Sequence, residues 1–381
     1  MSRRVYLHIG APKTGTTYLQ DRLALNASSL ADHGIHFPSR SPMVSPGLFH
    51  FRAALDLLGQ DWGGEPGHAV GNWPALMKRV RRRSGTVIIS HEILAPAHAE
   101  TVARAMADLR GSEVHIVYSA RDLGRAIPAA WQESIKQGRR WRYRKFLSST
   151  RHGKPWFFRA FDLPSVLATW GAGLPPERIH VVTVPHRPDP GPGAAAGPDP
   201  GAGPVEATPG DPLWLRFCEV FGIDPAWAPR DSDKTNQSLG VAETQLIRQL
   251  NRRLGRATRR EASFDALIRE MLAQDKLMAR RSAPVRLPPR LYDWADQMSE
   301  RWIDYLRQSG VDVVGDYQDL RPVRPPEGTP WHDPDRVPAR QRLQVSLEAL
   351  TAMTREAAAR PDPDQSLRHR VRQRAARLRG Q

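Results

Sequence analysis

The 381-residue chain is long enough to bury one large hydrophobic core, and its formal net charge of +16 favours an anionic ligand. A single cysteine, Cys218, excludes an intrachain disulfide, and no apolar stretch reaches the ~18 residues of a membrane span. Because the sequence begins without the apolar region of a secretion signal, we expect a soluble cytoplasmic protein with no membrane span.

The positive charge is unevenly distributed. Residues 321–381 hold 13 Arg and no Lys against 7 Asp and Glu, a charge of +6, and the other 320 residues carry +10. A basic tail is typical of proteins that bind nucleic acid or acidic membranes, but a solvated segment is commoner, so we expect no nucleic-acid partner. The basic body suits a small anionic ligand.

Strands and helices alternate through the first half of the chain. An apolar run at 5–9 predicts a strand, which leads through residues 10–17 into a helix at 18–31. Similar patterns predict strands at 35–38, 86–90, 114–118 and 179–183, and helices at 50–58, 73–83, 97–109, 123–137 and 163–170. This alternation predicts a central, mostly parallel sheet covered on both faces, a three-layer α/β/α fold.

The second half begins with a composition break. Fifteen of the 28 residues at 185–212 are Pro or Gly, which predicts a flexible insertion. Helical spacing then returns at 212–221, 240–254, 264–276 and 291–306. We therefore expect one α/β domain over residues 1–320 with additional C-terminal helices. Residues 321–381 are expected to form a Pro- and Arg-rich, partly disordered tail with one helix at 339–359.

A glycine-bearing loop joins the first strand to the first helix. Gly10-x4-Gly15-Thr16-Thr17 nearly fits the triphosphate-binding pattern G-x4-G-K-[ST], but the lysine stands inside the loop, at position 13. The strand at 86–90 also ends without an acidic residue for a metal, and no His/Cys/Asp/Glu spacing indicates a metal site. A kinase or ATPase with bound Mg²⁺ is therefore disfavoured, and we expect no metal.

Three clusters of functional residues fall where predicted strands end. They are residues 10–17, 90–92 and 121–125. In open α/β sheets ligands bind outside the carboxyl ends of the strands, so we expect these clusters to meet at one edge of the sheet.

Two of these clusters resemble a known family. Pro12-Lys13-Thr14-Gly15-Thr16-Thr17 resembles the 5′-phosphosulfate loop of the PAPS-dependent sulfotransferases, and Tyr118-Ser119-Ala120-Arg121-Asp122 resembles their 3′-phosphate signature. The resemblance spans roughly residues 3–320 and is closest to a bacterial branch. It implies a P-loop type fold, like that of the nucleoside triphosphate hydrolases. It also implies 3′-phosphoadenosine 5′-phosphosulfate (PAPS) as the sulfuryl donor, used without a metal.

The resemblance also implies roles for individual residues. Lys13 would neutralise the oxygen from which the sulfuryl group leaves, and the loop from Pro12 through Thr14 and Gly15 to the hydroxyls of Thr16 and Thr17 would hold the 5′-phosphate. Arg121 would bind the 3′-phosphate.

One position departs from the family pattern. The family has a serine eight residues after the arginine, but Ala129 stands there in this chain. Arg125, one helical turn after Arg121, is our hypothesis for the residue that replaces that serine.

A general base is required as well. Ser90-His91-Glu92 matches the place where cytosolic members carry a Thr-His pair, so alignment makes His91 the base. Other branches use a glutamate, which keeps Glu92 a candidate. A structural role at the strand end is the alternative for both residues.

Other residues have weaker claims. Gln132 and Lys136 face either the acceptor cleft or solvent, and Lys234 is a candidate for a late phosphate contact. Cys218, within an apolar pattern, is expected in the core rather than as a nucleophile.

We therefore predict a sulfotransferase that moves a sulfuryl group from PAPS to the hydroxyl or amine of an acceptor that the sequence does not identify. The alternatives are a nucleotide-dependent kinase and a non-catalytic anion-binding protein. The sequence does not indicate an oligomeric state.

Overall fold

The computed structural model describes residues 3–41, 43–154, 156–186, 211–232, 238–255, 258, 264–277, 280 and 282–359. Most of the predicted insertion, Lys234 and the arginines beyond residue 359 lie outside these residues. None of the described helices is long and apolar enough to cross a membrane.

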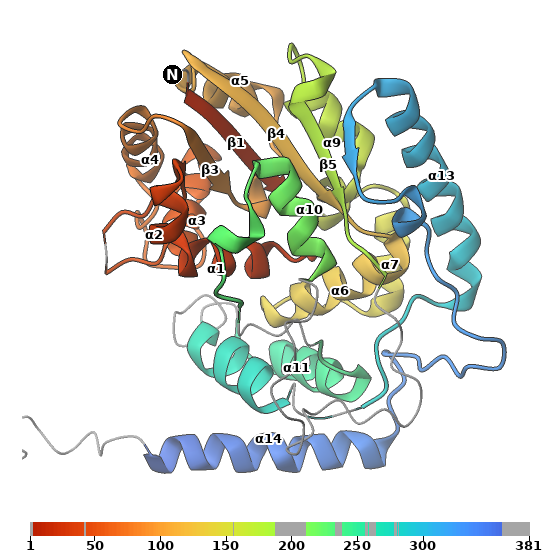
Figure 1. The fold of residues 1–381 in the computed structure, drawn as a ribbon. Helices are drawn as coiled ribbons and strands as arrows, with labels where there is room; N and C mark the ends of the chain where they lie inside the picture. The colour runs from red at the N-terminus through yellow and green to blue at the C-terminus, as the bar shows by residue number, and fades with distance from the viewer. Residues whose placement is uncertain are drawn as a thin grey trace, which may run out of the picture.

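Six parallel strands form the central sheet, in the order β2-β3-β1-β4-β5-β6 (Figure 1). Their bounds are β1 Arg3–Gly10, β2 Ile35–His36, β3 Thr86–Ser90, β4 Ser112–Ala120, β5 Ile179–Thr183 and β6 Asp312–Val314. β1 is flanked by β3 and β4, and His8 pairs with Ser90 on one side and Val117 on the other. The carboxyl ends of these three strands are therefore neighbours. This confirms the predicted three-layer α/β/α fold.

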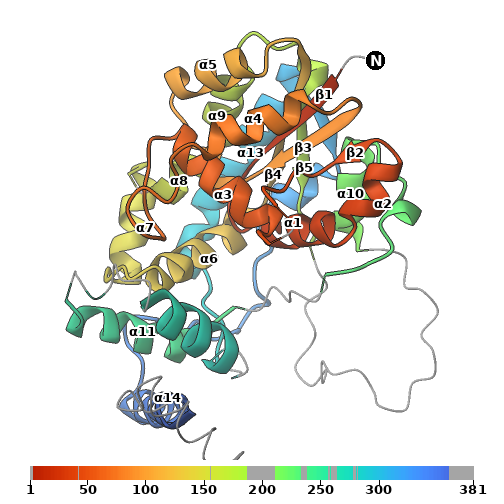
Figure 2. The same ribbon diagram turned by 90° about the vertical axis from the view of Figure 1, so that its left-hand side faces the viewer.

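The alternation of side chains along the strands divides the core in two. Val5, Leu7 and Ile9 point to one face of the sheet, and Tyr6 to the other. The first face packs on α3 Pro46–Leu57, α4 Asn72–Arg81, α5 Ala99–Asp108, α9 Leu163–Trp170 and α13 Tyr292–Ser309. The second packs on α1 Thr16–Leu25, α2 Ala27–Asp32 and α10 Pro212–Phe221 (Figure 2).

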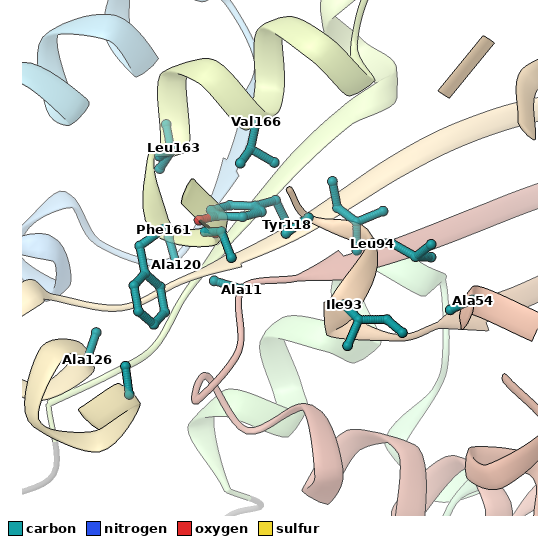
Figure 3. Close-up of a cluster of buried hydrophobic side chains, with 14 of the residues drawn as sticks. Ala11, Ala54, Ile93, Leu94, Tyr118, Ala120, Ala126, Phe161, Leu163 and Val166 are labelled. Atoms are coloured by element: carbon teal, nitrogen blue, oxygen red, sulfur yellow. Dashed lines mark hydrogen bonds between the residues drawn. The ribbon is translucent and has the colours of Figure 1, made fainter. Parts of the chain in front are cut away.

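The core reaches the carboxyl end of the sheet on the first face. Figure 3 shows Tyr118 and Ala120 of β4 in a cluster of buried side chains that also includes Ile93, Phe161 and Val166. The Tyr118 hydroxyl donates to the Ala160 carbonyl at 2.8 Å. Ala11, which follows β1, lies in the same cluster and is 1% exposed. The first residue of the glycine loop is therefore anchored in the core.

More helices lie beyond the carboxyl end of the sheet. α6 Leu123–Lys136 follows β4, and α11 Val241–Arg253 and α14 Ala339–Ala359 lie beyond it in both views (Figures 1 and 2). A π-helical segment, η5 Asp265–Leu277, contacts α6, α11 and α14. Short 3₁₀ turns complete the described chain: η1 Glu92–Leu94, η2 Pro176–Arg178, η3 Pro225–Trp227, η6 Pro289–Leu291 and η7 Tyr317–Leu320.

The structure differs from the sequence prediction at three places. The helix predicted at 18–31 is divided into α1 and α2 at Asn26, whose amide donates to the Arg22 and Arg230 carbonyls at 2.8 Å each. α7 Tyr143–Arg151 and α8 Trp156–Phe161 lie in a region for which no helix was predicted. β6 was not predicted, because only one of its three residues is buried.

Residues 321–338 lie against the body. Asp335 accepts from the backbone N–H groups of Tyr143 and Arg144 at 3.0 Å each, and Trp331 donates to the Arg286 carbonyl at 3.2 Å. The helix predicted at 339–359 is confirmed as α14. The domain boundary near Leu320 and the partly disordered tail stay predictions.

Candidate functional site

The loop between β1 and α1 has an unusual backbone. Gly10, Lys13 and Gly15 have φ angles of 113°, 67° and 89°. A Cβ on Gly15 would lie 2.7 Å from Leu213 Cδ2, and one on Gly10 would lie 3.0 Å from Glu92 Cα. Both positions thus favour glycine for conformation, and at Gly10 the backbone of Glu92 also leaves little room for a Cβ. The loop leads into the N-terminus of α1, whose first N–H groups have no partner within the helix.

The glycine loop is joined directly to the end of β4. Arg121 Nη1 donates to the Lys13 carbonyl at 2.9 Å, across 108 positions of sequence. The backbone N–H of Ala11 donates to the Ser119 carbonyl at 2.8 Å. The two resembling motifs therefore meet at one edge of the sheet, with the backbone of one held by the side chain of the other.

A chain of buried hydrogen bonds lies beneath the loop. His8 contacts the hydroxyl of Ser90 through Nδ1 at 2.7 Å and that of Ser119 through Nε2 at 3.2 Å. Ser119 Oγ lies 2.5 Å from Thr14 Oγ1, which donates to the Ala11 carbonyl at 2.5 Å. The hydroxyl of Thr14 is thus used inside the protein, which leaves its backbone N–H for the predicted contact with an anion.

The proton positions along this chain follow from its ends. Thr14 donates to a carbonyl, so the Ser119 hydroxyl donates to Thr14 and accepts from His8 Nε2–H. His8 Nδ1 is then the acceptor for the Ser90 hydroxyl, which itself accepts from the Gln20 amide at 3.3 Å. Burial lowers the pKa of His8 to about 4, which keeps the imidazole neutral.

His91 and Glu92 begin the turn η1, next to the loop. His91 Nδ1 accepts from the Ile93 backbone N–H at 3.3 Å, so the proton of the neutral ring is on Nε2. Its ring packs against Phe51, with centroids 5.1 Å apart. Burial lowers the pKa of His91, although the Glu92 charge opposes this.

Glu92 is an ionised carboxylate at neutral pH. Burial alone raises its pKa, but His91, the Thr16 hydroxyl and the Lys13 charge together lower it below the ordinary value. A quarter of its side chain is exposed, against 11% for His91. Glu92 is therefore the more accessible of the two candidate bases.

The ammonium group of Lys13 lies on a carboxylate from α6. Lys13 Nζ is 2.6 Å from Glu133 Oε2, and Glu133 is also 2.8 Å from Lys136 Nζ and 3.7 Å from Arg269 Nη2. One carboxylate thus faces three cations, which lower its pKa although burial opposes them. The group as a whole keeps a surplus of positive charge beside the loop.

Arg125 faces the end of β5. Its guanidinium donates to the carbonyls of Val184 and Pro185 at 3.0 Å each and to Asp122 Oδ2. Asp122 in turn caps α6 through the Arg125 backbone N–H at 2.9 Å. The guanidinium therefore fastens three segments together, and its proposed contact with a 3′-phosphate stays a prediction.

The remaining candidates are placed as follows. Pro12 and Thr16 are buried, and Thr17 is exposed on the first turn of α1. Gln132 donates to the Leu239 carbonyl and to Thr244 Oγ1, inside the packing between α6 and α11. Cys218 is confirmed in the core, where burial raises the pKa of its thiol to about 12.

Sequence reasoning missed His8, Gln20, Ser119 and Glu133 as site residues. A signal existed for part of this set, because His8, Ser90 and Ser119 are polar residues near the ends of apolar strands, all on one face. For Glu133 the sequence shows only a charged residue within a predicted helix.

Comparison of the chain with protein-family models, curated proteins and solved structures finds no match.

Proposed function

We propose that this chain is a sulfotransferase that moves a sulfuryl group from PAPS to the hydroxyl or amine of an acceptor. The donor carries about four negative charges and has a phosphate at each end of its ribose. A protein that binds it needs an anion-binding loop and a second cationic group at a fixed separation.

The observation that carries the proposal is the bond from Arg121 to the Lys13 carbonyl. It places a guanidinium at the side of a glycine loop that opens onto a helix N-terminus. The positive φ angles of Gly10, Lys13 and Gly15 and the N-terminus of α1 fit a phosphate held by backbone N–H groups.

The reaction follows from the charges around the loop. Glu92 accepts the proton of the acceptor as the acceptor oxygen or nitrogen bonds to sulfur. The bond between sulfur and the bridging phosphate oxygen breaks, and its electron pair stays on that oxygen. Lys13 stabilises the resulting charge, for which its ammonium leaves Glu133.

We favour Glu92 over His91 as the base. Nδ1 of His91 already accepts the Ile93 N–H, and Nε2 carries the proton, so neither nitrogen has a lone pair for the acceptor. Glu92 is ionised and more exposed, and it interacts with the Lys13 charge.

Binding of the donor product tests the proposal. In a thermal-shift experiment, 3′,5′-adenosine bisphosphate should stabilise the protein, and ATP with Mg²⁺ should not. Arg121→Gln should weaken the bisphosphate about 10- to 100-fold, because a charge-assisted pair is lost, whereas Arg104→Gln on exposed α5 should change nothing. Stabilisation by ATP·Mg²⁺ alone, or by neither ligand, would contradict the proposal.

Release of the bisphosphate from PAPS with water as the acceptor tests the base. Glu92→Gln should reduce the rate by ~10² or more, and His91→Gln should retain most of it. In the wild type the rate should fall only below about pH 4.5, because the pKa of Glu92 is lowered. A large loss in His91→Gln with full activity in Glu92→Gln would reverse the assignment.

A further inference from the structure

A strongly cationic hollow lies at the carboxyl end of α6, outside the candidate site. Its volume is about 520 Å³, and its walls come from the segment 139–142, α7 and α11. The lining residues include five arginines, Lys145 and Trp141, and no carboxylate. Figure 1 shows α11 beyond α6 and α7, at the end of the body where α14 also lies.

The segment 139–142 is held in place from behind. Asn251 Nδ2 donates to the Arg139 carbonyl at 2.9 Å, Arg248 Nη1 to the Arg140 carbonyl at 3.3 Å, and Trp131 Nε1 to the Trp141 carbonyl at 3.3 Å. Three successive carbonyls are thus bonded to side chains of α6 and α11. The arginines of the segment are presented by a fixed backbone, so little ordering is needed to bind a ligand.

Arg248 is the buried member of the set. It is 3% exposed, and its Nε donates to Gln245 Oε1 at 2.7 Å. Burial lowers its pKa, Asp335 opposes this, and the charges of Arg252 and Arg142 lower the pKa further. The Asp335 carboxylate is already used by the backbone N–H groups of Tyr143 and Arg144.

Neighbouring carboxylates do not neutralise the hollow. Over the described part of the chain, none of its six cations forms an ion pair with Asp or Glu. Like charges held together around a hollow repel one another, and bound counter-charge removes that repulsion.

We propose that this hollow binds a compact polyanion, a ligand with several phosphate or sulfate groups. Guanidinium groups bind tetrahedral oxyanions with paired hydrogen bonds, and six cations at one site match several such groups better than one. Neither Lys13 nor Arg121 lines the hollow. The site is therefore separate from the one assigned to the sulfuryl donor and does not depend on the proposed reaction.

Calorimetric titration with tripolyphosphate and with sucrose octasulfate, at about 0.15 M salt, tests the proposal. Wild-type protein should bind at least one of them, and the one bound identifies phosphate or sulfate as the natural group. The variant Arg142→Gln/Arg252→Gln removes two exposed cations and should weaken binding at least ~10-fold. Arg104→Gln/Arg110→Gln, which removes the same two positive charges at exposed arginines on and just after α5, should leave binding unchanged.

The double variant also separates this proposal from the donor site. Its affinity for 3′,5′-adenosine bisphosphate should equal that of the wild type, and Arg121→Gln should keep its affinity for the polyanion. Absence of binding, or equal binding by wild type and double variant, would overturn the proposal. The proposal would also be overturned if single-stranded DNA bound more tightly than either probe and the double variant lost this binding. The hollow would then be a nucleic-acid-binding surface.

Discussion

The ammonium group of Lys13 has two carboxylates within its influence. It forms an ion pair with Glu133 and lowers the pKa of Glu92. Glu133 holds the lysine of the loop, and Glu92 lies across the loop beside Gly10. In the proposed reaction one of these carboxylates gives up the lysine, and the other takes a proton from the acceptor.

Glu133→Gln should destabilise the protein by about 1–3 kcal/mol, because three cations lose their shared, largely buried carboxylate. The pKa of Glu133 is lowered in the folded state, so its contribution is present above the unfolded value of about 4.5 and is lost as pH falls below it. Urea unfolding of the wild type and of Glu133→Gln should therefore give free energies of unfolding that differ less near pH 4 than at pH 7. A constant difference would mean that the charge of Glu133 is not responsible.

Two buried histidines should make the fold sensitive to acid. Burial lowers the pKa of His8 to about 4 and of His50 to about 3, whereas unfolded histidines titrate near 6.5. The unfolded chain therefore binds more protons below pH 6.5, so stability falls as pH decreases from 6.5 toward 4.

Scanning calorimetry should accordingly give a Tm that falls steeply over this interval. The variant His8→Gln/His50→Gln, measured the same way, should be less stable at pH 7 but less dependent on pH. His33→Gln/His152→Gln, which replaces two exposed histidines, is the matched control and should leave the pH dependence of the Tm unchanged. If the Tm of His8→Gln/His50→Gln depended on pH as strongly as that of the wild type, these two histidines would not be the cause of the acid sensitivity.

Among the helices, α10 contacts the glycine loop through Leu213. Leu213, in the first turn of α10, fills the space beside Gly15. Farther along α1, Arg22 Nη1 donates to the Tyr18 hydroxyl at 2.7 Å, and its guanidinium lies 4.5 Å from the centroid of the Trp214 ring of α10. The helix that follows the Pro- and Gly-rich segment therefore supports the end of α1 whose N–H groups are proposed to bind an anion.

Gly15→Ala should lower stability by about 1–2 kcal/mol and weaken the bisphosphate, since its φ of 89° and the Leu213 contact both oppose a Cβ. Leu213→Ala removes only the steric part of this penalty. In Gly15→Ala/Leu213→Ala, bisphosphate affinity should thus recover partly, as measured by titration. Full recovery would show that the backbone conformation of Gly15 is unimportant, and no recovery would exclude the contact as a cause.

The elements with strong local patterns could be predicted from the sequence. β3, β5, α9, α10 and α14 have the predicted bounds, because apolar periodicity and capping residues mark them locally. α7 could not be predicted, since its first N–H groups are bonded by the carboxylate of Asp335, which is 192 residues from Tyr143. β6 is defined by its pairing with β5 rather than by its own composition.

The candidate site, too, could be predicted only in part. The meeting of residues 10–17, 90–92 and 121–125 follows from parallel topology alone. The partners of these residues do not, because Glu133, Gln20 and Leu213 come from helices whose rotation is set by packing. His115 and His180 are buried in apolar strands, but their rings form a 2.8 Å hydrogen bond with each other. They also contact Glu113 and Asp312, an arrangement that the apolar pattern of the strands does not indicate.

At the scale of the whole molecule, positive charge is concentrated beyond one end of the sheet. Lys13, Lys136 and Arg269 lie beside the loop, and the cationic hollow lies where α6 ends. Binding of 3′,5′-adenosine bisphosphate and of the polyanion should therefore both weaken as salt increases from about 0.05 to 0.5 M, over which the Debye length falls from ~14 to ~4 Å. Titrations across this range should show a larger loss of affinity for the polyanion than for the bisphosphate. Affinities that do not depend on salt would contradict electrostatic binding of these ligands.

The buried chain from Gln20 through His8 to Thr14 permits only one direction of donation. It begins at an amide N–H and ends at the Ala11 carbonyl, which has no proton to give, so the order of protons cannot be inverted. A proton relay must reset by inversion after each turnover, and this chain has no second arrangement. Despite its central histidine, the chain is therefore unsuitable for proton transfer. It holds the loop in place, and in the proposed reaction the proton is taken up by Glu92.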